Sequence, residues 1–90
     1  MRKPDLTAYI ADQADIPLEK SQLVLAAILD EITQALRRGD NVSLVGFGTF
    51  EKRHRAARIG KNPQTGAALT IAATNTVAFK PGKGLRDAIN

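Results

Sequence analysis

A chain of 90 residues and 9.7 kDa has room for one small domain and not for two of ordinary size. The absence of cysteine excludes a disulfide scaffold, a thiolate zinc site and a cysteine nucleophile. Residues 1–45 carry five Lys or Arg against seven Asp or Glu, whereas residues 46–90 carry eight against two. The net charge of +4 therefore comes from the second half, as is typical of a surface that binds a polyanion.

The first half of the chain predicts two helices. Pro4 suits a first helical turn, and apolar residues recur every fourth position from Leu6, which predicts a helix over about residues 4–14. A second helical pattern follows the interruption at residues 15–17 and ends where two arginines precede Gly39. Its apolar stripe is broader than one short helix can cover, so we expect a partner subunit.

The second half predicts strands and a short final helix. Residues 42–44 alternate as a strand, and the alternation resumes at Thr49 after a glycine-containing interruption. Residues 53–60 and 67–75 then form a long hairpin joined by the turn-rich segment 61–66. A helix over residues 84–89 completes an α+β chain.

The hairpin is expected to protrude as an arm. Eight extended residues span about 26 Å at ~3.3 Å each, whereas a compact chain of this length has a radius of gyration near 12 Å. Alternation places Arg53 and Arg55 on one face and His54 and Arg58 on the other, so neither face can enter a core cheaply. We therefore divide a single domain, residues 1–90, into a body (1–52 and 76–90) and a two-stranded β-ribbon arm (53–75).

The arm carries residues suited to nucleic acid. A two-stranded ribbon fits a groove, and guanidinium groups bridge phosphates and base edges. The alternative is that the charges only keep an exposed hairpin in solution, but this stretch has almost no compensating acids. Pro63 at the tip is either an ordinary turn proline or a rigid wedge between base pairs.

A longer motif then becomes visible in residues 46–66. Its members are Gly46, Phe47, Phe50, Arg55, Arg58, Gly60 and the run Asn62, Pro63, Gln64, Thr65, Gly66. Their spacing resembles the signature of the HU/integration host factor family of bacterial histone-like DNA-binding proteins, and the resemblance extends over the whole chain. The arm is most similar to that of HU. The resemblance implies an intertwined dimer with a helical dimerisation body, whose arms lie in the minor groove of duplex DNA and whose tip prolines intercalate to kink it.

The resemblance also implies roles for individual residues. The expected DNA-binding residues lie on the arm, at its tip and on the body: Arg53, Arg55, Arg58, Lys61, Asn62, Pro63, Lys3, Lys80, Lys83 and Arg86. Pro63 is expected to intercalate. The expected dimer core consists of apolar residues from the long helix and the sheet: Val24, Ile28, Leu29, Ile32, Leu36, Leu44, Phe47, Phe50 and Phe79.

These features predict an architectural protein that bends and compacts double-stranded DNA with little sequence specificity. Minor-groove readout is degenerate, so bent, nicked or flexible DNA is expected to be preferred through its deformation energy. A homodimer is expected, and a heterodimer with a paralogue is left open. The expected location is the nucleoid in the cytoplasm. The alternative within the family is a sequence-preferring bender of the integration host factor type.

Other functional classes fit the sequence less well. The single histidine, His54, lies on an exposed strand, no His, Asp and Glu cluster has metal-ligand spacing, and the residues around Gly82-Lys83 lack the Walker pattern. We therefore predict no enzyme, no cofactor and no metal. An aromatic content of 4% disfavours a single-strand binder, although RNA remains a secondary ligand. No apolar run is long enough to cross a bilayer and the long helix carries acids, so no membrane partner is expected.

Overall fold

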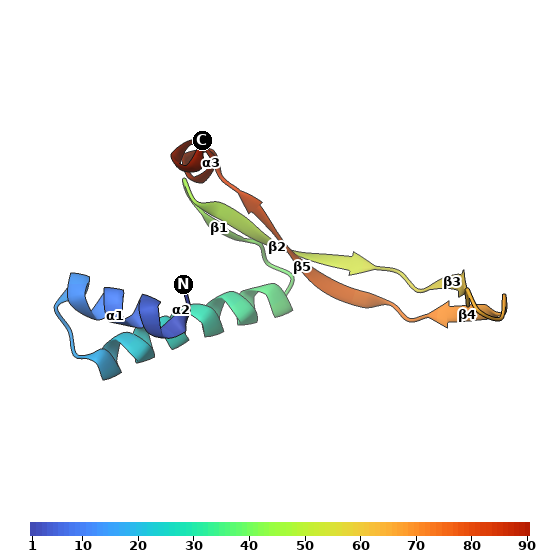
Figure 1. The fold of residues 1–90 in the computed structure, drawn as a ribbon, viewed down its shortest axis with the longest axis horizontal. Coiled ribbons are helices and arrows are strands. Elements are labelled where there is room, and N and C mark those ends of the chain that lie inside the picture. Colours follow the sequence, from blue (N-terminus) through green and yellow to red (C-terminus); the bar gives the residue numbers. More distant parts are fainter. The chain divides into compact units, whose positions relative to one another are not determined.

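The computed structural model describes residues 1–90, which form two compact units, residues 1–34 and residues 35–90. The elements labelled in Figure 1 are α1 (Lys3–Ala14), α2 (Leu18–Arg37), β1 (Val42–Leu44), β2 (Gly48–Arg55), β3 (Arg58–Lys61), β4 (Ala68–Ile71), β5 (Thr74–Pro81) and α3 (Lys83–Ile89). Three helices and two antiparallel sheets confirm the predicted α+β class. None of the helices has the length and apolarity of a membrane span.

In the first unit, local hydrogen bonds set the limits of the helices. The Asp5 carboxylate accepts a hydrogen bond of 2.9 Å from the Arg2 backbone N–H, which caps the start of α1. Asp15 adopts a left-handed conformation with φ 52°, and the following N–H donates back to Ala11. The carbonyl of Pro17 accepts the first hydrogen bond of α2 from Ser21, at 3.1 Å.

The first unit buries few side chains. Leu25 is 7% exposed, and the hydroxyl groups of the buried Thr7 and Ser21 donate to carbonyls three residues earlier in the chain. A hollow between α1 and α2 is lined by residues that include Pro4, Thr7 and Leu29. This unit therefore has a thin apolar core, and most of the apolar stripe of α2 stays accessible.

The end of α2 follows the sequence prediction. Gly39 has φ 88°, a conformation that glycine adopts without steric cost. Its N–H donates to Leu36, and the Asp40 N–H donates to Ala35 at 2.9 Å, which satisfies carbonyls of the last helical turn. Ala35 and Leu36 are both buried in the second unit.

The second unit is built on a three-stranded antiparallel sheet of order β1-β2-β5. Phe50 lies opposite Phe79 in the register of β2 and β5, with their ring centroids 4.8 Å apart, and Phe47 packs against Phe79 at 5.6 Å. Backbone hydrogen bonds from Gly82 to Phe47 and from Leu85 to Gly46 attach the start of α3 to the β1–β2 turn. Helix α3 therefore lies at the end of the sheet away from the arm (Figure 1). The register of β2 and β5 places the pair Phe50 and Phe79 near the same end.

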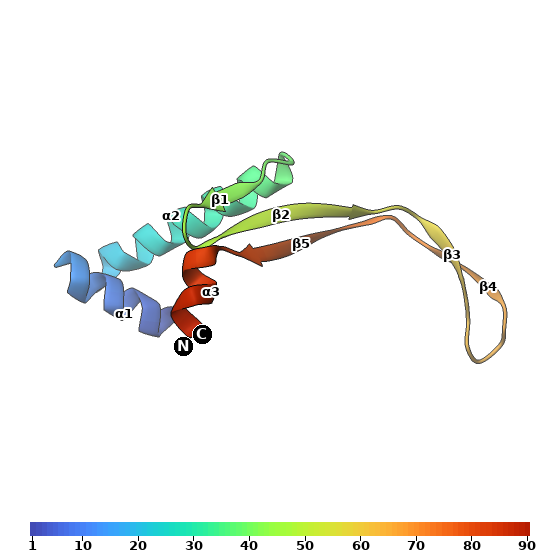
Figure 2. The same ribbon diagram turned by 90° about the horizontal axis from the view of Figure 1, so that it is seen from above.

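The arm extends from β2 and β5 into the second sheet, β3 and β4. The predicted continuous strands 53–60 and 67–75 are interrupted after Arg55 and before Thr74, and pairing resumes between Arg58 and Ile71. Two residues on each strand are left unpaired. Because the number is the same on both strands, the pairing of the second sheet continues the register of the first. The skipped residues are all alanines, which have low strand propensity and short side chains for cross-strand contacts. The ribbon changes direction at this interruption (Figure 2).

We expect Gly48→Ala to destabilise the sheet. A Cβ at this position would lie 2.6 Å from the Phe79 Cε1 atom and 2.7 Å from the Lys80 carbonyl oxygen, so the ring and the backbone of β5 must both shift. Overpacking of this kind costs about 1–3 kcal/mol. Urea unfolding followed by circular dichroism at one fixed protein concentration measures the change in stability.

Gly60→Ala is the matched control, because its Cβ would meet only the flexible end of Ile71 at 3.1 Å. A substantially smaller decrease in stability is expected for this variant. Equal decreases in the two variants would contradict the steric explanation and point to a general cost of replacing a strand glycine.

Candidate nucleic-acid interface

Four predicted cations lie on the two strands, β2 and β3, that lead from the body to the tip of the arm. Arg53 and Arg55 belong to β2, and Arg58 and Lys61 belong to β3. All four side chains are exposed, and the last three form no ion pair. Because lysine and arginine carry their charge at neutral pH, this stretch of the ribbon presents positive charge to any polyanion beside it.

The tip is a short loop closed by hydrogen bonds around Asn62. The Asn62 N–H donates to Ala67 at 2.8 Å, its carbonyl accepts from Gly66 at 2.7 Å, and its side-chain oxygen accepts from the Gln64 N–H at 2.9 Å. These three hydrogen bonds of Asn62 stabilise the turn. Pro63 follows it directly and is exposed, so the ring stands at the end of the ribbon on a backbone fixed from both sides.

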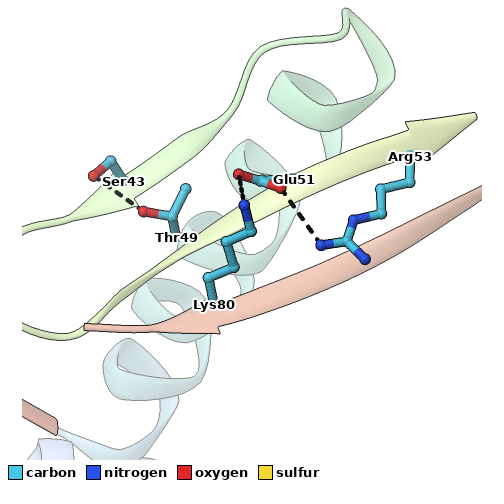
Figure 3. Close-up of polar contacts among 5 residues, drawn as sticks. All are labelled: Ser43, Thr49, Glu51, Arg53 and Lys80. Carbon is cyan, nitrogen blue, oxygen red and sulfur yellow. Dashed lines mark hydrogen bonds and ion pairs between the residues drawn. The ribbon is translucent and has the colours of Figure 1, made fainter. Parts of the chain in front are cut away.

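Glu51 is an acid within the cationic surface, and the sequence did not indicate its contacts. Its two carboxylate oxygens lie 3.3 Å from Lys80 Nζ and 3.9 Å from Arg53 Nη2, and its side chain is 22% exposed (Figure 3). The neighbouring Ser43 and Thr49 hydroxyls approach each other at 3.4 Å. Two of the predicted DNA-binding cations, Arg53 and Lys80, are thus partly neutralised within the protein.

The remaining body cations are divided between the two units. Lys3 lies in the first turn of α1 and is exposed. Lys83 and Arg86 lie on α3, where Lys83 forms an ion pair of 2.6 Å with Asp87 one turn later. Such exposed pairs contribute little to stability, so a phosphate can compete for this lysine at low cost.

The predicted dimer-core residues differ in how far one chain covers them. Leu36 is buried, and Ile32 and Phe50 are partly covered. The other six are exposed: Val24, Ile28, Leu29, Leu44, Phe47 and Phe79. Large apolar side chains exposed in this number on the long helix α2 and on a small sheet mark surfaces for interaction.

The whole of this chain matches one known family. Residues 1–90 match the family described as bacterial DNA-binding protein. The DNA-binding protein HU-alpha of Pseudomonas aeruginosa is 66% identical over 90 residues, which is 100% of each chain. The DNA-binding protein HU of Geobacillus stearothermophilus is 47% identical over 89 residues, which is 99% of each. This chain belongs to the HU family.

Solved structures of HU have the same fold. The HU–DNA cocrystal structure from Anabaena has a TM-score of 0.86 with 42% identity, and the match covers 99% of this chain and 97% of that one. HU from Thermotoga maritima has a TM-score of 0.69 with 30% identity over 100% of both chains. The α+β architecture with a ribbon arm is thus the fold of HU.

Two polar contacts of this HU-family chain were not predicted from the sequence. Besides Glu51, His54 Nδ1 lies 2.8 Å from the side-chain oxygen of Asn75, its partner in the β2–β5 register. The pairing of His54 with Asn75 could have been predicted from the sequence, because the two residues lie equally far from the centre of the tip turn on the two strands of the hairpin. Sequence reasoning placed His54 on one face of the arm and rejected it as a catalytic residue, but assigned it no partner.

Proposed function

We propose that this HU-family protein is an architectural DNA-binding protein that bends and compacts duplex DNA with little sequence specificity. The observation that carries the proposal is the exposed ribbon whose cations Arg55, Arg58 and Lys61 have no acidic partner and which ends in an exposed proline. Family membership and the DNA in the Anabaena HU complex support it.

Phosphate contacts supply the affinity in this proposal. Each cation that neutralises a phosphate releases condensed counterions, which is favourable and independent of base sequence. The arm lies in the minor groove, where A·T and T·A pairs present similar acceptors and direct readout is degenerate. Lys3, Lys80, Lys83 and Arg86 contact the flanking phosphates. RNA carries the same phosphate charge and is the proposed secondary ligand.

Pro63 converts binding into bending. A wedge between base pairs costs a few kcal/mol of stacking, which the bent duplex offsets through additional contacts with the protein. The hydrogen bonds around Asn62 hold the loop, so little conformational entropy remains to be lost when the ring inserts. DNA that is already nicked or flexible is bound more tightly because its deformation costs less.

A second copy of the chain covers the exposed apolar surface in the proposed assembly. One chain has only three buried hydrophobic residues, Leu25, Ala35 and Leu36, which is too thin a core for independent stability. The proposed homodimer also provides two arms. A heterodimer with a second HU chain uses the same surface, and the nucleoid in the cytoplasm is the proposed location because chromosomal DNA is the ligand.

The test of the proposed function is a salt titration of binding to three duplexes of equal length. Two have unrelated random sequences and the third carries a nick. We expect equal affinity for the random duplexes, tighter binding to the nicked one and a steep decrease of affinity with salt. Strong discrimination between the random duplexes would favour a sequence-preferring bender, and no binding at low salt would overturn the proposal.

Two kinds of variant test the phosphate contacts in the same titration. The slope of log K against log salt is negative. Arg58→Gln and Lys61→Gln should each make it less steep, by up to about 0.9 for each phosphate that the arm no longer neutralises. Glu51→Gln should make the salt dependence steeper, because it releases Lys80 and Arg53 from their internal ion pairs and leaves both cations available to phosphates. Unchanged slopes in all three variants would contradict the role of this surface.

Pro63→Ala should reduce bending more than affinity. The substitution removes the rigid ring and leaves the arm cations in place. Energy transfer between dyes at the ends of a labelled duplex measures the bend, and binding isotherms on the same duplex measure affinity. An unchanged bend angle would eliminate the wedge role of Pro63.

Ile28→Lys should weaken dimerisation. Ile28 is 49% exposed in one chain, and a charge there would be desolvated against the partner. Tyr9→Lys is the control, because Tyr9 is exposed on α1 outside the predicted dimer core. Sedimentation equilibrium and the concentration dependence of Tm should change only for Ile28→Lys. A folded wild-type monomer at micromolar concentration would refute the dimer.

A further inference from the structure

The single histidine of the chain has a defined environment on the arm. His54 is exposed on β2 between two arginines in the sequence, and its Nδ1 atom lies 2.8 Å from Asn75 Oδ1 across the ladder. An amide oxygen can only accept a hydrogen bond, so Nδ1 carries the proton of the neutral ring. Nε2 is therefore the nitrogen left free to receive a second proton or a ligand.

This hydrogen bond is compatible with both charge states of the ring. Nδ1 is protonated in the neutral form assigned by Asn75 and in the imidazolium alike. Adding a proton at Nε2 requires no rearrangement of Asn75, and a charged donor makes the bond to the amide oxygen stronger. The ring orientation is thus held fixed while its charge changes.

No carboxylate faces His54 from either strand. Strand alternation places Lys52 on the same face of β2, and the β5 residues opposite these two positions are Asn75 and Val77. Glu51 belongs to the other face with Arg53, and both of its oxygens contact cations there. An anion that neutralises the imidazolium must therefore come from outside these two strands.

We propose that His54 is a further DNA contact of the arm, which binds a backbone phosphate as the imidazolium through Nε2–H, so that DNA binding takes up a proton. This inference rests on the proposed function. Histidine changes charge between about pH 5 and pH 8. Because the bound protein holds more protons than the free protein, affinity for DNA rises as the pH falls through this range.

The experiment compares the wild-type protein with two variants on one nicked duplex. His54→Gln keeps a polar side chain that is neutral at every pH used, and His54→Lys carries a permanent charge. Salt titrations at pH 6.0 and pH 8.5 give the slope of log K against log salt. Calorimetry at pH 7 in two buffers of different ionisation enthalpy gives the number of protons taken up.

For the wild type we expect a steeper salt slope at the lower pH, by up to about 0.9 for each histidine that meets a phosphate. Proton uptake should exceed that of His54→Gln by up to one per chain. Both variants should show a much smaller change of slope with pH than the wild type, equal in the two, and the slope of His54→Lys should match that of the wild type at low pH. The α-amino group is present in all three proteins and cancels in the comparison.

Other outcomes are distinguishable. Equal proton uptake and equal pH dependence in wild type and His54→Gln would overturn the role of His54 while leaving DNA binding intact. If the wild-type affinity rises at low pH but the salt slope stays unchanged, the imidazolium contacts an acceptor on a base edge and not a phosphate. That result would also overturn the proposal. Failure to bind DNA at either pH would instead remove the proposed function itself.

Discussion

The antiparallel pairing of β2 with β5 is the interaction on which the rest of the second unit depends. One register runs from Gly48 and Pro81 at the base to the last pair of the arm, Lys61 and Ala68. It places Phe50 opposite Phe79 near one end and the exposed turn at the other. The same register brings Glu51 near Lys80 and His54 opposite Asn75. The positions of the phenylalanine pair, of the polar contacts and of the tip turn thus all follow from a single alignment of the two strands.

The pairing divides the ribbon into regions of different chemistry. Near the base, Phe50 and Phe79 make apolar contacts across the strands, and the proposed partner chain would extend this apolar cluster. Farther out, residues 52–55 of β2 and residues 74–77 of β5 are exposed, so solvent reaches both faces. The alanines between Arg55 and Arg58 separate the two sheets. A chain with little core of its own can maintain such a ribbon because backbone hydrogen bonds between the strands do not require a buried face.

Much of the fold could be predicted from the sequence. The helix limits followed from local signals, namely Pro4 at the start of the first helix and Gly39 after the second, because helix ends are decided within a few residues. The hairpin and its tip followed from the turn residues 61–66. The interruption of the arm was not predicted, since alternation alone does not reveal where alanines provide too little cross-strand contact. The family resemblance supplied the assignments of function.

The contacts of the candidate site were harder to predict than its location. Charge composition identified the arm, but the pairing of Glu51 with two cations depends on side-chain geometry across neighbouring strands. The partner of His54 depends on register, which a single sequence specifies only once the turn is known. Counting charges therefore overestimated the positive charge available to DNA near the base of the arm.

The shared register across the alanine interruption also limits how the arm can change in length. Inserting one residue in a single strand would create a bulge or move every later side chain of that strand to the opposite face. A change that keeps each side chain on its face needs two residues on both strands, which lengthens the ribbon by roughly 6.6 Å at ~3.3 Å per residue. The distance of Pro63 from the base of the ribbon can therefore be adjusted only in discrete steps.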